Sequence, residues 1–482
     1  MKPFRGIAGA LAAIAGLSSA SALAGEAAHR GALVVTGLRT VGFEDAGPQL
    51  REGIALLIEE GRIVYSGPAA GLPPAEGALR VDGAGLTALP GLADMHVHVW
   101  DEAELGAYLA HGVTTVRNMS GMPFHLRLAQ RIAAGELAGP RLLTTGPILN
   151  SAGPNQQINH QLVETAEQGR AAVRAQHAAG FTDLKLYSNL KRAPLEAILQ
   201  EAALLGMSVS GHPPEGERSE GIPFEKPFAI SFEEVLDDGF LTIEHSESIA
   251  WHGLSDSHDE EQARALARRI AASGAAVTPT LLAYENLVLT AESRGAFANR
   301  PGIEWLNPLI RQTEVEMVDY WSSAEPEGSR EHAAFLGRFT AMMQQEGVPL
   351  VAGSDAGIFL NLPGESLLDE LALLVRGGLT PWQALRSATH NVAQLLGEAG
   401  TSGCLGEGCR ADLVLYRCDP LADISCTREP AAVIRAGRFH SAEQLSGLLD
   451  GAARHDPQRT GQNLLEGMAA QGTPIDPAML GL

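Results

Sequence analysis

Residues 86–100 read LTALPGLADMHVHVW, an apolar run that ends in two histidines one residue apart. The alternation of the run and its bounding proline and glycine predict a buried strand. Because residues i and i+2 of a strand point to the same face, His96 and His98 project together, while Met95 and Val97 point to the other side. Two imidazoles on one face can bind a single metal ion, and a polar strand end is the simpler alternative. The rest of the chain has to decide between these two interpretations.

Seven further apolar runs follow, separated by Ala- and Leu-rich stretches with helical periodicity. This alternation is typical of βα units around a parallel sheet. Eight such strands predict an α/β fold in which residues 86–397 form a closed (β/α)8 TIM barrel. The eight runs are residues 86–98, 113–119, 141–146, 182–188, 207–212, 241–246, 275–281 and 349–357.

Polar side chains stand near the carboxyl-terminal ends of several of these runs. In a (β/α)8 barrel the active site lies at this end, because the strand ends and the following loops converge there. Each residue alone has a structural explanation, as a strand cap, the start of a loop or a solvated edge charge. Together they place six metal-binding groups around one mouth. We therefore expect a metal site made of His96, His98, Lys185, His212, His245 and Asp355.

Lys185 lies in the apolar stretch FTDLKLY, where burial disfavours the charged form of an amine and lowers its pKa. A lysine of this kind can react with carbon dioxide to form a carbamate, an anion able to bridge two divalent ions. The prediction is then a binuclear centre with the carbamate and a hydroxide between the ions. One ion takes the first two histidines and the aspartate, and the other takes His212 and His245. The alternative is an ordinary lysine paired with Asp183 or another carboxylate.

The motifs LPGLADMHVH, KLYSNL, SGHPPE, TIEHSES and VAGSDAG, followed by GCLGEGCRADLVLYRCDPLADI, resemble those of the amidohydrolase superfamily. The closer resemblance is to its imidazolonepropionase-like and Xaa-Pro dipeptidase-like branch, and it spans nearly the whole mature chain. It implies a carboxylated Lys185 that bridges two zinc ions, with ligand roles for the histidines and the aspartate of these motifs. One departure is that Pro213, Pro214 and Glu215 follow His212, where dipeptidase-like relatives often carry an aromatic residue.

The resemblance further implies a small second domain built from both flanks of the barrel. Residues 30–85 and 398–445 are expected to form this β-sandwich, and the tail, residues 446–482, to contain a helix and a loose end. Residues 285–347 are long for one βα connection and predict a helical insertion that covers the mouth. A peripheral pair of helices in a subunit contact is the alternative for this segment.

Asp355 is the expected catalytic residue. A hydroxide held between two divalent ions is a nucleophile at neutral pH, and Asp355 can accept its proton and pass it to the leaving group. This scheme predicts hydrolysis of a C–N amide bond in a dipeptide or an N-acyl amino acid. Alternatives on the same site are a lactone or ester hydrolase and a mononuclear deaminase of a cyclic amidine. The spacing from His212 to Glu215 favours the deaminase, and the lysine argues against it.

Three side chains are candidates for contact with the substrate. Tyr187 has the same strand parity as Lys185 and should face the mouth one layer higher, with core packing as the alternative. His160 lies in the loop after the third strand, where a surface role is the alternative. Arg117, which with Asn118 ends the second strand, could contact a carboxylate or an amide.

The net charge of −22 over 482 residues argues against nucleic acid and anionic membranes as partners. The expected partner is a small-molecule substrate, and a homo-oligomer is left open. Residues 1–24 have a positive start, an apolar core and an A-x-A cleavage site, as in a secretory signal peptide. Export to the periplasm or the medium is therefore expected.

All four cysteines, Cys404, Cys409, Cys418 and Cys426, lie in one stretch of 23 residues. An oxidising compartment favours disulfides over a structural zinc cluster, and no C-x-x-C spacing is present. Four cysteines permit three pairings. The local bridges Cys404–Cys409 and Cys418–Cys426 are preferred, because each pair encloses a turn that contains glycine or proline.

Overall fold

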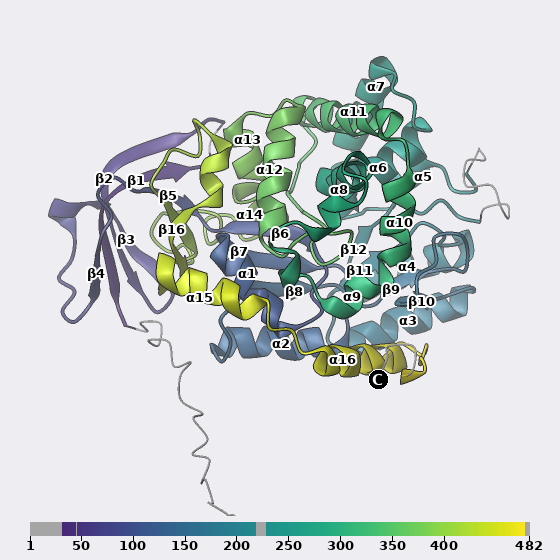
Figure 1. Cartoon of the computed structure of the whole chain (residues 1–482), viewed down its shortest axis with the longest axis horizontal. Coiled ribbons are helices and arrows are strands. Elements are labelled where there is room, and N and C mark those ends of the chain that lie inside the picture. The colour runs from purple at the N-terminus through teal and green to yellow at the C-terminus, as the bar shows by residue number, and fades with distance from the viewer. Residues whose placement is uncertain (1–30, 45, 218–227, 478–482) are drawn as a thin grey trace, which may run out of the picture.

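The computed structural model describes residues 31–44, 46–217 and 228–477. The expected signal peptide, residues 1–24, lies outside the described residues. Figure 1 shows a small sheet beside a larger part in which helices surround parallel strands. The predicted α/β fold with a second, smaller part made from both flanks is confirmed.

The small sheet joins strands from both flanks of the barrel. Its order is β17-β16-β15-β5-β1-β2-β3, with β4 paired to β1, and the antiparallel pair β5–β15 connects the two flanks. Leu33 and Leu56 share one apolar core with Leu413 and Ile434. In place of two separate layers, the strands form one continuous sheet around this core. They are β1 (Leu33–Gly42), β2 (Gln49–Glu59), β3 (Arg62–Pro68), β4 (Leu79–Asp82), β5 (Thr87–Pro90), β15 (Leu413–Tyr416), β16 (Pro430–Arg435) and β17 (Arg438–Ser441).

The first predicted strand, residues 86–98, divides into two strands in different sheets. β5 ends at Pro90 in the small sheet, and β6 (Leu92–Val97) then enters the barrel. Gly91 lies between them, so close to the side chain of Thr114 that a Cβ at this position would overlap it. The small sheet therefore extends past residue 85, where its end was expected, because the chain changes sheet only at this glycine.

The barrel strands are parallel and fall into two groups, β6-β7-β8 and β10-β9-β11-β12-β13-β14. The N–H of Gly146 donates to the carbonyl of Asp183 at 2.8 Å and joins the groups on one side. On the other side, residues 349–357 form no regular strand but bridge both β14 and β6. The strands are β7 (Val113–Asn118), β8 (Arg141–Thr144), β9 (Ile148–Asn150), β10 (His160–Leu162), β11 (Asp183–Leu186), β12 (Ser208–Gly211), β13 (Thr242–Glu244) and β14 (Ala276–Thr278).

Amphipathic helices cover the outside of these strands. α3 begins at a cap in which Thr165 accepts a backbone N–H, and it buries Val173 against the core. No helix in the described ranges combines the length and the apolar character needed to cross a membrane. The covering helices are α1 (Leu105–Ala110), α2 (Pro123–Ala134), α3 (Ala166–Ala179), α4 (Arg192–Leu205), α5 (Phe232–Asp237), α6 (Ser246–Ile249), α7 (Glu260–Ser273), α12 (Glu365–Gly377), α13 (Pro381–Ser387) and α14 (His390–Leu395).

A helical insertion lies between β14 and the last barrel segment. Its helices are α8 (Leu281–Glu292), α9 (Pro308–Thr313), α10 (Val315–Ser323) and α11 (Pro326–Gln345). Tyr284 of α8 and Trp321 of α10 line the cavity at the barrel mouth. The insertion therefore covers the mouth, as its length and composition predict.

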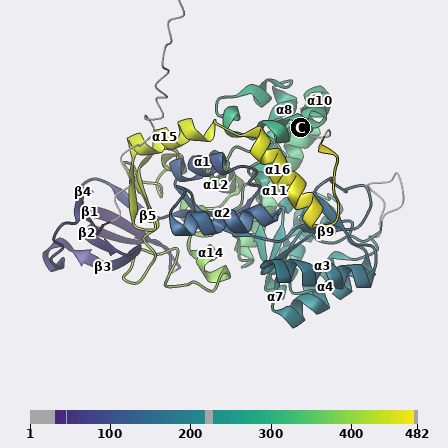
Figure 2. The same ribbon diagram turned by 90° about the horizontal axis from the view of Figure 1, so that it is seen from below.

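The described part of the carboxyl-terminal tail contains two helices, and residues 478–482, where the loose end was expected, lie outside the described residues. α15 (Ala442–Ala452) packs on α1, and α16 (Pro457–Ala470) packs on α2 and α9. Figure 2 shows α16 beside α2 along one side of the barrel. Arg459 of α16 forms an ion pair with Asp101, with Nη2 2.6 Å from Oδ1. Asp101 is buried and lies in the loop that follows His96 and His98.

Candidate metal centre

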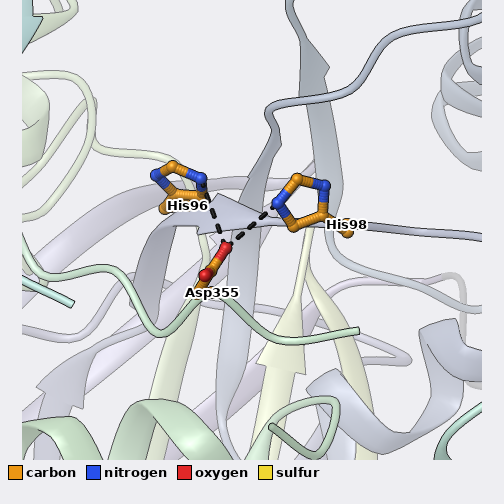
Figure 3. A group of neighbouring side chains, drawn as sticks. All are labelled: His96, His98 and Asp355. Atoms are coloured by element: carbon orange, nitrogen blue, oxygen red, sulfur yellow. Dashed lines mark hydrogen bonds and ion pairs between the residues drawn. The ribbon is translucent and has the colours of Figure 1, made fainter. Parts of the chain in front are cut away.

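His96, His98 and Asp355 lie close together at the barrel mouth. Each offers one ligand atom, and these atoms all lie within 4.8 Å of one another. Asp355 Oδ1 is 3.0 Å from His98 Nε2 and 3.4 Å from His96 Nε2 (Figure 3). All three side chains are buried. Three donor atoms thus surround one point, as a divalent ion requires.

The other three predicted ligands join this group. The ring centroid of His245 lies 4.6 Å from that of His96 and 4.3 Å from that of His212. Lys185 Nζ lies 3.5 Å from His96 Nε2. All six side chains line one cavity of about 310 Å³. The structure therefore brings the whole predicted set together, and the ligand role of each member stays a prediction.

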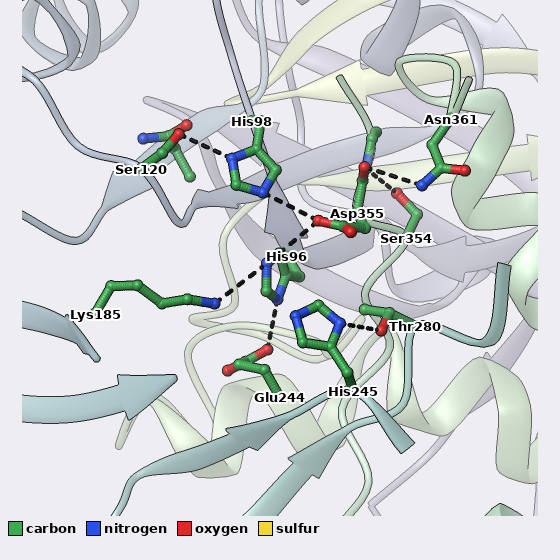
Figure 4. A network of polar contacts seen from close by, with 12 residues as sticks. His96, His98, Ser120, Lys185, Glu244, His245, Thr280, Ser354, Asp355 and Asn361 are labelled. Carbon is green, nitrogen blue, oxygen red and sulfur yellow. Dashed lines mark hydrogen bonds and ion pairs between the residues drawn. The ribbon is translucent and has the colours of Figure 1, made fainter. Parts of the chain in front are cut away.

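Outer hydrogen bonds direct three of the histidine rings into the cavity (Figure 4). In each, Nδ1 is bonded to a side chain behind the ring, so Nε2 points inward, an arrangement typical of histidine ligands. The pairs are His96 with Glu244 (2.7 Å), His98 with Ser120 (2.9 Å) and His245 with Thr280 (2.6 Å). In His212, Nδ1 is buried without a hydrogen-bond partner among the described residues. A buried, unsatisfied imidazole nitrogen next to such a set fits a metal ion.

The backbone is strained where two of these side chains leave their strands. The φ angles are 69° at His245 and 57° at Asp355. The left-handed region costs a residue with a Cβ about 1–3 kcal/mol, and such residues cluster at functional sites. In both cases the turn at the strand end brings the side chain onto the cavity wall.

Lys185 is buried at the site, and none of the described carboxylates forms an ion pair with its amine. Its side chain is 1% exposed, and burial lowers the pKa of its amine to about 8. Asp183 instead accepts a hydrogen bond from Thr182 Oγ1 at 2.7 Å and contacts Ser208 Oγ. Asp183 therefore does not pair with Lys185, and the carboxylates whose charges act on the amine are those of Glu244 and Asp355.

The electrostatics of the site favour a bound cation. Burial holds the pKa of His96, His212 and His245 well below the usual value, so these imidazoles are neutral, the form that binds metal. Burial acts to raise the pKa of Asp355, but the hydrogen bond from His98 and the charges of its neighbours outweigh it and lower this pKa. The site thus combines neutral nitrogen donors with an ionised carboxylate.

Arg117 lies behind the metal site rather than in the cavity. Its Nη2 is 2.9 Å from Glu244 Oε1, and its Nε donates to the carbonyl of Met95 at 2.8 Å. Glu244 in turn bonds His96, so the three side chains form one buried chain. The predicted contact of Arg117 with substrate is wrong, because the side chain points into the barrel below the mouth. Glu244 was not predicted from the sequence, where its one signal is a carboxylate in a buried strand directly before His245.

Tyr187 packs against the ring of His212, and His160 packs against the ring of Tyr187. Tyr187 lines the cavity, with its ring centroid 3.9 Å from that of His212 and 4.5 Å from that of His160. His160 is 1% exposed, and its Nδ1 is 3.1 Å from Asn150 Nδ2. The surface alternative for His160 is therefore wrong. Tyr187 thus faces the cavity, whereas His160 contacts the tyrosine ring and does not line the cavity within the described part of the chain.

The cysteines lie next to the small sheet and form two local disulfides. Cys404 is bonded to Cys409, with an S–S distance of 2.06 Å, and Cys418 to Cys426, with a distance of 2.04 Å. This is the pairing that the turns between them favour. None of the four lines the cavity of the metal site.

Comparison with known proteins gives the family. The sequence profile described as the Amidohydrolase family matches residues 87–439. The chain belongs to this family. An imidazolonepropionase from Idiomarina loihiensis is 23% identical over 426 residues, which cover 79% of this chain and 90% of that protein. The expected family is thereby confirmed, and with it a hydrolase that acts on carbon–nitrogen bonds.

Solved structures of related proteins share the fold of this amidohydrolase. Bottromycin amidohydrolase is similar with a TM-score of 0.69 and 23% identity, covering 93% of this chain and 92% of that one. A putative prolidase from Bifidobacterium longum is similar with a TM-score of 0.62 and 23% identity, covering 88% and 100% of the two chains. The family is typically metal-dependent, which agrees with the cluster of His96, His98 and Asp355.

Proposed function

We propose that this amidohydrolase is a binuclear enzyme that hydrolyses amide bonds. Two divalent ions, most simply zinc, would be held by the six side chains at the mouth, with a carbamate on Lys185 between them. The observation that carries the proposal is the burial of Lys185 beside the histidines without a described carboxylate partner. A buried, unpaired ammonium is strongly unfavourable, whereas a carbamate is an anion that suits two cations. One ion would take His96, His98 and Asp355, and the other His212 and His245.

The divalent ions would lower the pKa of a water to about 7 and polarise the substrate carbonyl. The proton acceptor of the chain itself is Asp355, whose carboxylate lies on the cavity wall and is ionised at neutral pH. It would take the proton of the attacking water and return it to the nitrogen that leaves. Tyr187, which lines the same cavity, would donate a hydrogen bond that orients the substrate.

The walls of the cavity favour amides that carry an apolar or aromatic group. Leu287 and Trp321 come from the insertion, and Ile148, Ile358 and Phe359 complete the apolar surface. N-acyl amino acids and dipeptides with a bulky apolar group next to the amide are therefore the substrates that we propose. The similarity to a protein named as a putative prolidase supports the peptide-like part of this class.

The structure lends no support to the deaminase alternative. That mechanism needs a glutamate close to the reacting carbon, in the position three residues after His212. Glu215 occupies this position but is not among the described residues that line the cavity.

The test uses the purified chain loaded with zinc. Metal analysis should give two ions per chain, and a panel of N-acyl amino acids, dipeptides, cyclic amidines, lactones and aryl esters should show the highest kcat/KM with an amide. Asp355→Asn should retain at least one ion and lose about a hundredfold or more in kcat. A single ion per chain, or turnover confined to amidines or esters, would contradict the proposal.

A further inference from the structure

The loop that begins at Asp355, residues 355–361, has a strained backbone at three positions. Asp355, Phe359 and Leu360 all have left-handed backbones, with φ angles of 57°, 51° and 61°. Each such residue costs about 1–3 kcal/mol and persists only where surrounding contacts determine the conformation. The loop therefore needs partners that hold it. β6 and Trp100 hold residues 355–357, since the N–H of Asp355 donates to the carbonyl of His96 and Trp100 Nε1 donates to the carbonyl of Gly357 at 3.0 Å. Further partners, for residues 359–361, come from the helical insertion.

The first contact comes from Asn286 on α8. Its Nδ2 donates to Asn361 Oδ1 at 2.6 Å, and Asn361 Nδ2 donates to the carbonyl of Asp355 at 3.1 Å. Both asparagines are buried, with exposed fractions of 1% and 0%. Buried amide pairs of this kind are well defined, because an unmade hydrogen bond there is costly. α8 is thus linked to the backbone of Asp355 through one residue.

Two more contacts hold the strained part of the loop. Glu314, between α9 and α10, accepts the N–H of Phe359 on Oε1 at 2.6 Å. Arg300 Nη2 donates to the carbonyl of Leu360 at 2.6 Å. Three separate points of the insertion therefore contact a loop of seven residues.

The loop and the insertion also share the cavity wall. Ile358 and Phe359 of the loop line the cavity together with Tyr284, Leu287 and Trp321 of the insertion. A displacement of the insertion would move both the wall and the backbone from which the Asp355 side chain projects. A misplacement of 1 Å at a catalytic group can cost about a hundredfold in rate.

We propose that Asn286 and Glu314 are positioning residues for Asp355: through them the helical insertion fixes the 355–361 loop and aims the carboxylate at the cavity. Neither residue lines the cavity within the described part of the chain. The inference rests on the proposed function only where it assigns proton transfer to Asp355. The insertion is then part of the catalytic apparatus as well as a cover for the mouth.

The kinetic test compares Glu314→Ala with Glu314→Gln at saturating zinc. The glutamine keeps an oxygen that can accept the Phe359 N–H, so it should retain kcat within about threefold, whereas alanine should lower kcat about ten- to a hundredfold. Asn286→Ala should behave like Glu314→Ala, with KM changed far less than kcat. The matched controls are Glu316→Ala and Asn299→Ala, two exposed positions of the insertion that should keep wild-type kcat. Equal losses in the alanine and glutamine variants of Glu314, or wild-type kcat in both alanine variants, would overturn the proposal.

Hydrogen exchange gives a readout that does not depend on activity. In Glu314→Ala the amides of residues 355–361 should exchange at least tenfold faster than in wild type, while β11 and β12 stay protected. If the wild-type protein hydrolyses no amide, the proposed function fails, and hydrogen exchange still decides whether the insertion fixes the loop. Unchanged exchange in this loop would overturn the inference in either case. Faster exchange together with wild-type kcat would overturn its catalytic part.

Discussion

Glu244→Gln is expected to weaken metal binding while the fold is kept. Glu244 Oε2 lies 2.7 Å from His96 Nδ1, and Oε1 lies 2.9 Å from Arg117 Nη2. Both partners are buried, with exposed side-chain fractions of 1% and 5%. A glutamine has one acceptor oxygen and no charge, so it cannot serve both donors. The ring of His96 would then lose the partner that fixes its tautomer and its direction.

The size of the effect follows from this geometry. Loss of an outer hydrogen-bond partner of a histidine ligand usually weakens metal affinity about 10- to 100-fold, which corresponds to about 1.4–2.7 kcal/mol. Glu244→Ala should in addition destabilise the protein by about 3–5 kcal/mol, because the guanidinium of Arg117 would be buried without a counter-charge. Adding Arg117→Met to that variant should recover most of the stability but none of the metal affinity.

The assay is a zinc titration against a competing chelator, with urea unfolding measured on the same samples. Glu201→Gln is the matched control, since its carboxylate also binds an arginine, Arg174 at 2.8 Å, but on the outer helices α3 and α4. This control should keep wild-type affinity for zinc. Wild-type affinity in Glu244→Gln would refute the reasoning. If Arg117→Met raises KM and leaves the zinc affinity unchanged, Arg117 contacts the substrate after all.

Further outcomes are expected at other sites. Lys185→Ala should lose bound metal and activity, and short carboxylates with bicarbonate should restore a part; full activity would exclude the bridging role. Reduction of both disulfides should lower Tm and leave kcat unchanged, since the sulfurs lie away from the cavity; a large change in kcat would contradict this. Burial raises the pKa of Glu370 from 4.5 to about 8, so the folded state binds this proton more tightly, and the free energy of unfolding should fall as the pH rises between these values. In urea titrations at several pH values, Glu370→Gln should lose a few kcal/mol less of its free energy of unfolding than the wild type over this range. The same pH dependence in both proteins would contradict the expectation. Arg459→Ala should lower Tm and zinc affinity, because it breaks the pair with Asp101 in the loop that follows His98, and Arg459→Lys should restore part of both. Wild-type Tm and zinc affinity in the alanine variant would contradict this expectation.

Much of the barrel could be predicted because hydrophobic periodicity is a local property. Seven of the eight apolar runs contain a regular strand at the expected place. Two errors in the predicted strands arose because strand pairing depends on contacts with distant segments, which a local sequence pattern does not contain. The run 86–98 has the continuous apolar character of one strand, yet the chain changes sheet at Gly91. Residues 349–357 have a strand-like sequence, but they pair with their neighbours only through isolated bridges, Leu350 with Val277 and Ala356 with Val97.

The six predicted ligands met at one mouth because metal chemistry restricts the residue types at strand ends. Residues that support the ligands are less restricted, since a carboxylate, a serine or a threonine can each accept the hydrogen bond from a histidine ring. Ser120 and Thr280 are hydrogen-bonded to such rings here, and neither has a sequence signal of its own. Arg117 was misassigned for a related reason: strand parity gives the face of the sheet but not the depth below the mouth.

The unpredicted contacts share one property, their separation along the chain. Glu244 and His96 lie 148 residues apart, Asn286 and Asn361 lie 75 apart, and Arg459 and Asp101 lie 358 apart. Each of these contacts connects a supporting segment, namely a neighbouring strand, the insertion or the tail, to a loop or strand end of the metal site. Motifs at strand ends reveal the groups that bind and react, because chemistry selects them locally. The groups that hold them in place are selected by the folded chain, and only the structure brings them next to the residues that they support.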